Sequence, residues 1–200
     1  METLRNLADR KRLLALIVVA IIAVLVTSIA IYSVYLQPRP GTGSTFSDLS
    51  GDVELYVGTE YPGMIDVVGA SLQVSGNELK IIISVRDPIP NLAAGQDAQY
   101  NVTAILQNSA LKAYEISADL TSTGLTGHIV ELGESNTTTC QTTYDQKSLT
   151  IRAPIDELQS TKEIDWFVLT TYDKYNGTQL TSSGSDIAPK DGYQTTFLKS

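Results

Sequence analysis

The most constraining feature of this sequence is a run of 24 residues without a charge, a proline or a glycine, which begins at Leu13 and ends at Leu36. As an α-helix rising about 1.5 Å per residue, residues 13–36 would be about 36 Å long, and the hydrocarbon core of a bilayer is about 30 Å thick. The run therefore predicts a single transmembrane helix. The folded part of the chain must then come from the residues that follow it.

Basic residues before this run predict its orientation. Four of the first 12 residues are basic, namely Arg5, Arg10, Lys11 and Arg12, whereas Arg39 is the only basic residue close to the other end. Because cytoplasmic flanks carry the excess of Lys and Arg, these first 12 residues are predicted to be a cytoplasmic tail. The chain is then a single-pass protein of the cell membrane, with its remaining residues extracytoplasmic.

Two other interpretations of the N-terminus stay open. Ser28 and Ala30 are typical of a signal-peptide cleavage site, but a signal peptide has an apolar region of only about 7–15 residues. This run continues to Leu36, which favours an uncleaved signal anchor. An archaeal pilin-type leader would carry a small residue at its processing site, whereas here Arg12 directly precedes Leu13.

The rest of the chain divides into a linker and one domain. Residues 37–51 are rich in Pro, Gly, Ser and Thr, which is the composition of a flexible linker, and fully extended they would reach about 50 Å. Residues 52–200 are enough for one extracytoplasmic domain with its own hydrophobic core.

The extracytoplasmic part is acidic. Of the 14 Lys and Arg and the 22 Asp and Glu residues, four basic and two acidic ones precede Leu13, which leaves ten against 20 and a net charge of −10. A surface this negative, with no basic cluster in the sequence, excludes nucleic acid as a partner. The acidity is typical of a soluble domain at a cell surface.

Short apolar runs with β-branched residues and alternating polarity predict a domain made of strands. The predicted strands are residues 53–57, 65–74, 79–85, 100–106, 113–120, 128–132, 137–143, 149–153 and 164–172. This many short antiparallel strands predicts an all-β fold, specifically an antiparallel β-sandwich. Trp166, Phe167 and Leu169 are expected in its core.

Turn residues separate these strands. Hairpin turns are predicted at residues 75–78 and at residues 175–178, where Asn176 with Gly177 suits a tight type I′ turn. A loop is predicted at residues 87–97 and a single helical turn at residues 154–158. Cys140 is the only cysteine, so no intrachain disulfide can form. We expect Cys140 to be a small apolar filler in a strand.

Strand and turn patterns carry a resemblance to a known group of domains. They lie at residues 64–85, at the Asp-Pro-Ile-Pro of residues 87–90, at residues 151–158, at the Ile-Asp-Trp-Phe of residues 164–167, and at residues 186–192. From residue 52 to about residue 193 the chain is similar to exported β-sandwich domains related to family 9 carbohydrate-binding modules and DOMON domains. This resemblance implies an extracytoplasmic binding module, for sugars or occasionally for haem.

The chain departs from the ligand-binding members of that group. Trp166 is its only tryptophan, whereas sugar-binding faces present exposed aromatic residues. Haem ligation would have to rely on one histidine and on two methionines, one of which is the initiator. The resemblance therefore implies the fold without either ligand.

Catalysis is not expected. His128 is the only histidine, and the sequence has no nucleophile elbow, zinc-binding helix motif or phosphate-binding loop to accompany it. Asp156 and Glu157 are adjacent in a turn and are expected to point apart. The sequence predicts a protein that is not an enzyme and that carries no organic cofactor.

Calcium is the one cofactor that the residues suggest. Asp66, Asp87, Asp186 and Asp191 lie in or beside predicted loops, and loop carboxylates are ligands that Ca²⁺ prefers. The sequence has no EF-hand spacing. Because Asp also favours turns through its own backbone hydrogen bonds, a purely structural role is the alternative.

Three tripeptides on the extracytoplasmic side are acceptors for N-glycosylation. They begin at Asn101, Asn136 and Asn176, and none has proline in the middle position. The sequence therefore predicts a glycoprotein, with Asn176 in its hairpin the most accessible acceptor and Asn101 the least.

Two classes of function follow. The first is a membrane-anchored binding or interaction module of the cell envelope, whose partner is an envelope protein or a glycan. The second is a structural subunit of a surface filament or membrane complex, similar in general plan to archaellum stator subunits, with Ala23 and Thr27 as a small-residue pair for helix contact. The sequence favours the first.

Overall fold

The computed structural model describes residues 41–42, 44–59, 62–108, 111–190 and 192–198. The predicted cytoplasmic tail and transmembrane helix, the first part of the predicted linker, and Asp191 lie outside these residues. Among the described residues, none forms a helix of the length and hydrophobicity that crossing a membrane requires.

The described chain is built from strands and one short 3-10 helix. The strands are β1 (Gly41–Thr42), β2 (Thr45–Ser47), β3 (Glu54–Val57), β4 (Val67–Ser75), β5 (Glu78–Val85), β6 (Gln96–Gln107), β7 (Lys112–Thr121), β8 (Gly124–Glu131), β9 (Thr137–Asp145), β10 (Ser148–Pro154), β11 (Glu163–Asn176), β12 (Gln179–Ala188) and β13 (Gln194–Phe197). The 3-10 helix is η2 (Asp156–Ser160), at the place of the predicted helical turn. The predicted all-β class is confirmed.

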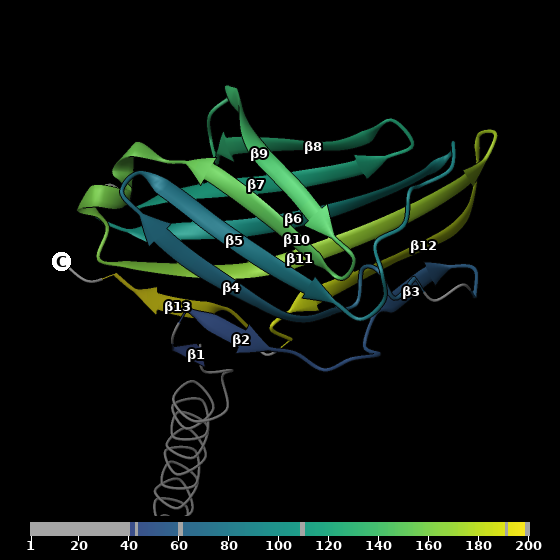
Figure 1. The fold of residues 1–200 in the computed structure, drawn as a ribbon, viewed down its shortest axis with the longest axis horizontal. Helices are drawn as coiled ribbons and strands as arrows, with labels where there is room; N and C mark the ends of the chain where they lie inside the picture. Colours follow the sequence, from purple (N-terminus) through teal and green to yellow (C-terminus); the bar gives the residue numbers. More distant parts are fainter. Residues whose placement is uncertain (1–40, 43, 60–61, 109–110, 191, 199–200) are drawn as a thin grey trace, which may run out of the picture. The chain divides into compact units, whose positions relative to one another are not determined.

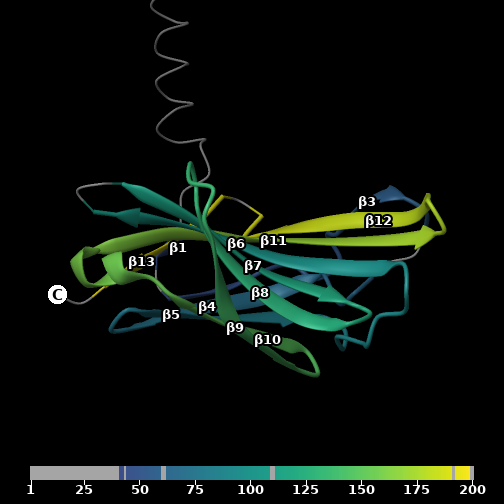
Figure 2. The ribbon, with the colours of Figure 1, turned by 90° about the horizontal axis from the view of Figure 1, so that it is seen from above.

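The strands form one continuous sheet. Its order is β1-β13-β11-β6-β7-β8-β9-β10-β5-β4-β2, with β12 beside β11 and β3 beside β12. All neighbours are antiparallel except β1 and β13. Figure 1 shows this path, and Figure 2 shows β4, β5 and β10 on one side of the domain and β6, β7 and β11 on the other.

The sheet curls at β9. Residues 137–140 of β9 pair with β8, whereas residues 141–145 pair with β10. A side chain at Gly127 of β8 would place its Cβ 2.5 Å from Thr142 and 2.7 Å from the Cys140 carbonyl oxygen, so only glycine allows the two strands to approach this closely. Cys140 is half-buried here and contacts the core, as predicted for a filler.

Alternating side chains fill the space inside the curl. β5, and β11 over residues 163–172, alternate strictly between buried and partly exposed residues, because successive side chains of a strand point to opposite faces. Trp166 is completely buried, as predicted. The prediction is wrong for Phe167 and Leu169, which are partly exposed: each is one residue out of phase with the inward positions of β11.

Both predicted hairpins are present, but the type I′ turn predicted at residues 175–178 is wrong, because the turn is shifted by one residue. Ser75 pairs with Glu78 across Gly76, and Asn176 pairs with Gln179 across Gly177. Each glycine has a positive φ, of 60° and 62°, and each is the first central residue of its turn. This is the position that type II′ hairpin turns reserve for glycine.

The predicted linker is wrong in part, because two of its segments belong to the sheet. β1 pairs with β13 at one edge, and β2 pairs with β4 at the other edge, so β1 and β2 together span the seam of the curled sheet. We call β1 and β2 the clasp. Phe46 of the clasp packs on Trp166 with 5.1 Å between ring centroids, and Gly69 of β4 leaves room for the Phe46 carbonyl.

Candidate functional site

Three carboxylates meet beside the clasp. Asp48 and Asp52 lie between β2 and β3, and Asp186 lies on β12, whose partner β3 follows directly in the chain. One oxygen of each carboxylate lies within 4.8 Å of the others. We call these three residues the acidic cluster.

The fold holds Asp186 rigidly in this cluster. Its side chain is 3% exposed, and its Oδ2 accepts a hydrogen bond of 2.7 Å from the Val67 backbone N–H. The neighbouring Asp66 is completely buried, accepts a hydrogen bond of 2.8 Å from the Gly51 N–H, and lies 3.4 Å from the Arg86 Nη1. These contacts connect the segment after the clasp to β4 and β12.

Two oxygens of the cluster lack hydrogen-bond partners. Asp48 Oδ2 and Asp52 Oδ1 are both inaccessible to solvent, and among the described residues neither accepts a hydrogen bond. Lys190 is the one cation in ion-pair contact with the cluster among those residues, with its Nζ 3.4 Å from Asp52 Oδ2. A buried carboxylate oxygen without a donor is costly, because the lost hydration is not replaced.

The electrostatics of the cluster follow from this arrangement. Burial, together with the charges of Asp52, Asp48 and Asp66, raises the pKa of Asp186 to about 6 against the opposing hydrogen bond from Val67. Burial, with the charge of Asp52, also raises the pKa of Asp48, against the Leu49 N–H. Both shifts mean that the folded chain resists ionisation of Asp48 and Asp186.

The donor set fits a hard divalent cation. Calcium binds carboxylate oxygens at about 2.3–2.6 Å, so two of its ligands are never more than about 5 Å apart. The separations within the acidic cluster satisfy this limit. A bound cation would also be a partner for Asp48 Oδ2 and Asp52 Oδ1, which accept no hydrogen bond from the described residues.

The structure brings together only part of the predicted calcium set. Asp186 belongs to the cluster and Asp66 lies beside it, whereas Asp191 is outside the described residues. Asp87 is not in the cluster, and its half-exposed carboxylate accepts a hydrogen bond of 3.0 Å from Arg86. Asp48 and Asp52 were missed because they lie in or beside the segment predicted to be a linker.

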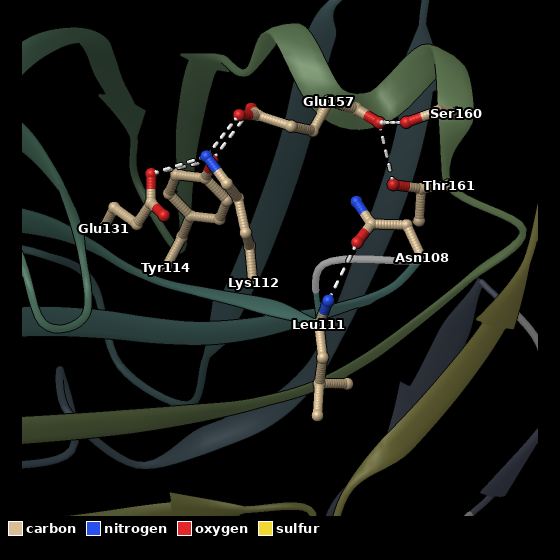
Figure 3. A network of polar contacts seen from close by, with 8 residues as sticks. All are labelled: Asn108, Leu111, Lys112, Tyr114, Glu131, Glu157, Ser160 and Thr161. Atoms are coloured by element: carbon tan, nitrogen blue, oxygen red, sulfur yellow. Dashed lines mark hydrogen bonds and ion pairs between the residues drawn. The ribbon is translucent and has the colours of Figure 1, made fainter.

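A second polar cluster connects η2 to β7 and β8 (Figure 3). The Lys112 Nζ lies 2.6 Å from Glu157 Oε1 and 3.0 Å from Glu131 Oε2, and the Tyr114 hydroxyl donates to Glu157 Oε2 at 2.8 Å. The hydrogen bond from Lys112, followed by that from Tyr114, lowers the pKa of Glu157. Because its donors and acceptors satisfy one another, this cluster is a structural connection.

The remaining predicted site residues are dispersed. His128 lies on β8 with its Nε2 3.7 Å from Asp119 Oδ2, and exposed Asp156 accepts a hydrogen bond from Asn77. Asn136 and Asn176 are exposed, whereas Asn101 is half-buried in β6 between β7 and β11.

Comparisons with protein-family models, with curated proteins and with solved structures found no match to this chain.

Proposed function

We propose that this chain is a membrane-anchored, extracytoplasmic binding module of the cell envelope, that it is not an enzyme, and that its partner is an envelope protein or a glycan. The observation that carries the proposal is the 24-residue apolar run, which ends only four residues before β1.

The finer description of the domain as a β-sandwich, similar to family 9 carbohydrate-binding modules and DOMON domains, belongs to the same proposal. Contacts across the core support it. The Tyr100 hydroxyl of β6 donates to the Met64 carbonyl at 3.0 Å, and the Thr170 hydroxyl of β11 donates to the Ile65 carbonyl at 2.5 Å, both just before β4.

External protease on intact cells tests the anchor. We expect loss of the β-domain and retention of a small N-terminal fragment that resists extraction by alkaline carbonate. Accessibility of residues 1–12 from outside, or release of the chain by carbonate, would contradict the proposal. Sedimentation of the detergent-solubilised chain as a polymer would favour the structural-subunit alternative.

The proposal includes one Ca²⁺ bound by Asp48, Asp52 and Asp186. The buried oxygens of Asp48 and Asp52 without donors support it. Calorimetric titration of the full chain in mild detergent should give one Ca²⁺ per chain, and Asp52→Asn should weaken binding while Glu134→Gln, which removes an exposed charge elsewhere, should not. Equal binding by both variants would show that the acidic cluster is not the site.

A further inference from the structure

The clasp covers only part of the outer edge of β4. β2 pairs with Gly69–Ser71 of β4, and the Leu72 N–H donates to the Ser44 carbonyl at 2.8 Å. β4 itself continues to Ser75, and no described strand pairs with its residues 73–75 on this side. Because backbone groups alternate between the two edges of a strand, Val74 is the next residue after Leu72 whose N–H and C=O face this edge. An open strand edge of this kind accepts another strand.

A groove of about 750 Å³ lies along this open edge. The buried side chains of Leu72 and Leu158 line it, together with polar residues of η2. Phe197 at the end of β13 also lines it and is 61% exposed. Lys162 is the only charged residue of the lining, and it has no ion pair with any described residue.

These features fit an extended peptide better than a compact ligand. A peptide that continues along β4 from the point where β2 stops would form main-chain hydrogen bonds with the edge, and every second side chain would enter the groove. β2 already binds in this way, with Phe46 inserted against Trp166. Lys162 would attract a carboxylate of the peptide. A site with a positive charge of this kind is unusual in a domain whose net charge is strongly negative.

We infer that this groove binds an extended segment of another protein, added as a strand to β4 at residues 73–75, with a carboxylate of that segment beside Lys162. The inference rests on the proposed function, since it names the partner class and the site of the binding module.

A synthetic peptide tests the inference on the full chain in mild detergent. The probe is a fluorescein-labelled heptapeptide of alternating threonine and valine with a free carboxyl terminus, and binding is measured by fluorescence anisotropy. Saturable binding is expected. N-methylation of alternate peptide nitrogens should weaken it on the order of tenfold, because it removes main-chain donors to the edge of β4. Amidation of the carboxyl terminus should also weaken it.

Variants locate the binding site. Phe197→Ala and Lys162→Gln should each weaken peptide binding, whereas Leu132→Ala, at another exposed apolar residue, and Lys147→Gln should leave it unchanged. Trp166 fluorescence reports whether each variant is folded, because Trp166 is the only tryptophan and is buried.

Each contrary result has its own meaning. No saturable binding below about 1 mM, or equal binding of the N-methylated peptide, would overturn strand addition. Binding that neither Phe197→Ala nor Lys162→Gln weakens would overturn the groove but leave a binding module. A chain that dimerises through Phe197 would have a second copy as occupant, which overturns the assignment to another protein. The protease experiment decides the proposed function independently of all three.

Discussion

Replacing Asp186 by asparagine should stabilise the domain at neutral pH in the absence of calcium. The asparagine side-chain oxygen can still accept the hydrogen bond from Val67, but the buried negative charge is gone. The pKa of Asp186 is about 6 in the folded chain and 3.8 in the reference state. At 1.36 kcal/mol per pKa unit, ionising Asp186 in the folded state costs up to about 3 kcal/mol.

The sign of the pH dependence follows directly. Because the folded state binds this proton more tightly than the unfolded state, the wild-type chain loses stability as the pH rises from about 4 to about 6. Asp186→Asn should lose much less over this range. At pH 7.5 in EDTA its melting temperature should exceed that of wild type by up to about 6–12 °C, since 1 kcal/mol corresponds to about 2–4 °C in a domain of this size.

Thermal melts followed by Trp166 fluorescence measure both effects in the full chain. Calcium at fixed ionic strength should raise the wild-type melting temperature, by the equivalent of about 2.7 kcal/mol at a hundredfold excess over Kd, and should have no effect on Asp186→Asn. Glu134→Gln is the matched control and should behave as wild type. A variant less stable than wild type at pH 7.5 in EDTA would refute the reasoning about the buried charge.

Three further predictions concern the clasp and the polar clusters. Phe46→Ala should lower the free energy of unfolding by about 2 kcal/mol, which is less than the ~3–5 kcal/mol for a fully buried phenylalanine because Phe46 is half-buried. Phe197→Ala, at an exposed residue, should change it by less than about 0.5 kcal/mol, and thermal melts compare the two variants. Glu157→Gln should lower the free energy of unfolding by up to ~1 kcal/mol at pH 7. This difference from wild type should vanish as the pH falls through the lowered pKa of Glu157, and it should shrink at high salt. Urea titrations at several pH values test both effects. A chain shortened to begin at residue 48 should aggregate in a sedimentation experiment, whereas one that begins at residue 40 should stay monomeric. Only the shorter chain exposes the parts of β4 and β13 that β2 and β1 cover, which are Gly69–Ser71 and Gln194–Thr195.

The regular strands could be predicted because their side chains repeat with the period of a half-buried strand. β4 was predicted because Leu72 and Val74 alternate with Ser71 and Gln73, whereas β5 was predicted because its residues are β-branched and nearly all apolar. Gly76 marks the turn between β4 and β5, and Gly177 marks the turn between β11 and β12. β12 was missed for the opposite reason. Its buried positions include Ser182, Ser185 and Asp186, so burial there depends on β3 and β11 and leaves no apolar pattern in the sequence.

The candidate site was harder to predict than the fold because it is a tertiary feature. Asp186 drew attention through its loop-like surroundings, but Asp48 and Asp52 become ligand candidates only when the clasp holds their segment against β12. The composition of residues 37–51 is that of a linker, and nothing local distinguishes Phe46, which packs in the seam, from an exposed residue of a flexible segment.

The clasp and the acidic cluster are consecutive in the chain, so their contributions to stability should not be independent. Displacing β2 moves Asp48 away from Asp186, which relieves repulsion between carboxylates at the same time as it removes Phe46 from Trp166. Without calcium the repulsion opposes the clasp, and with calcium the same carboxylates would hold it closed. Phe46→Ala and Asp186→Asn therefore form a double-mutant cycle whose coupling energy should differ between EDTA and calcium. Strict additivity in both conditions would mean that the cluster does not act on the clasp.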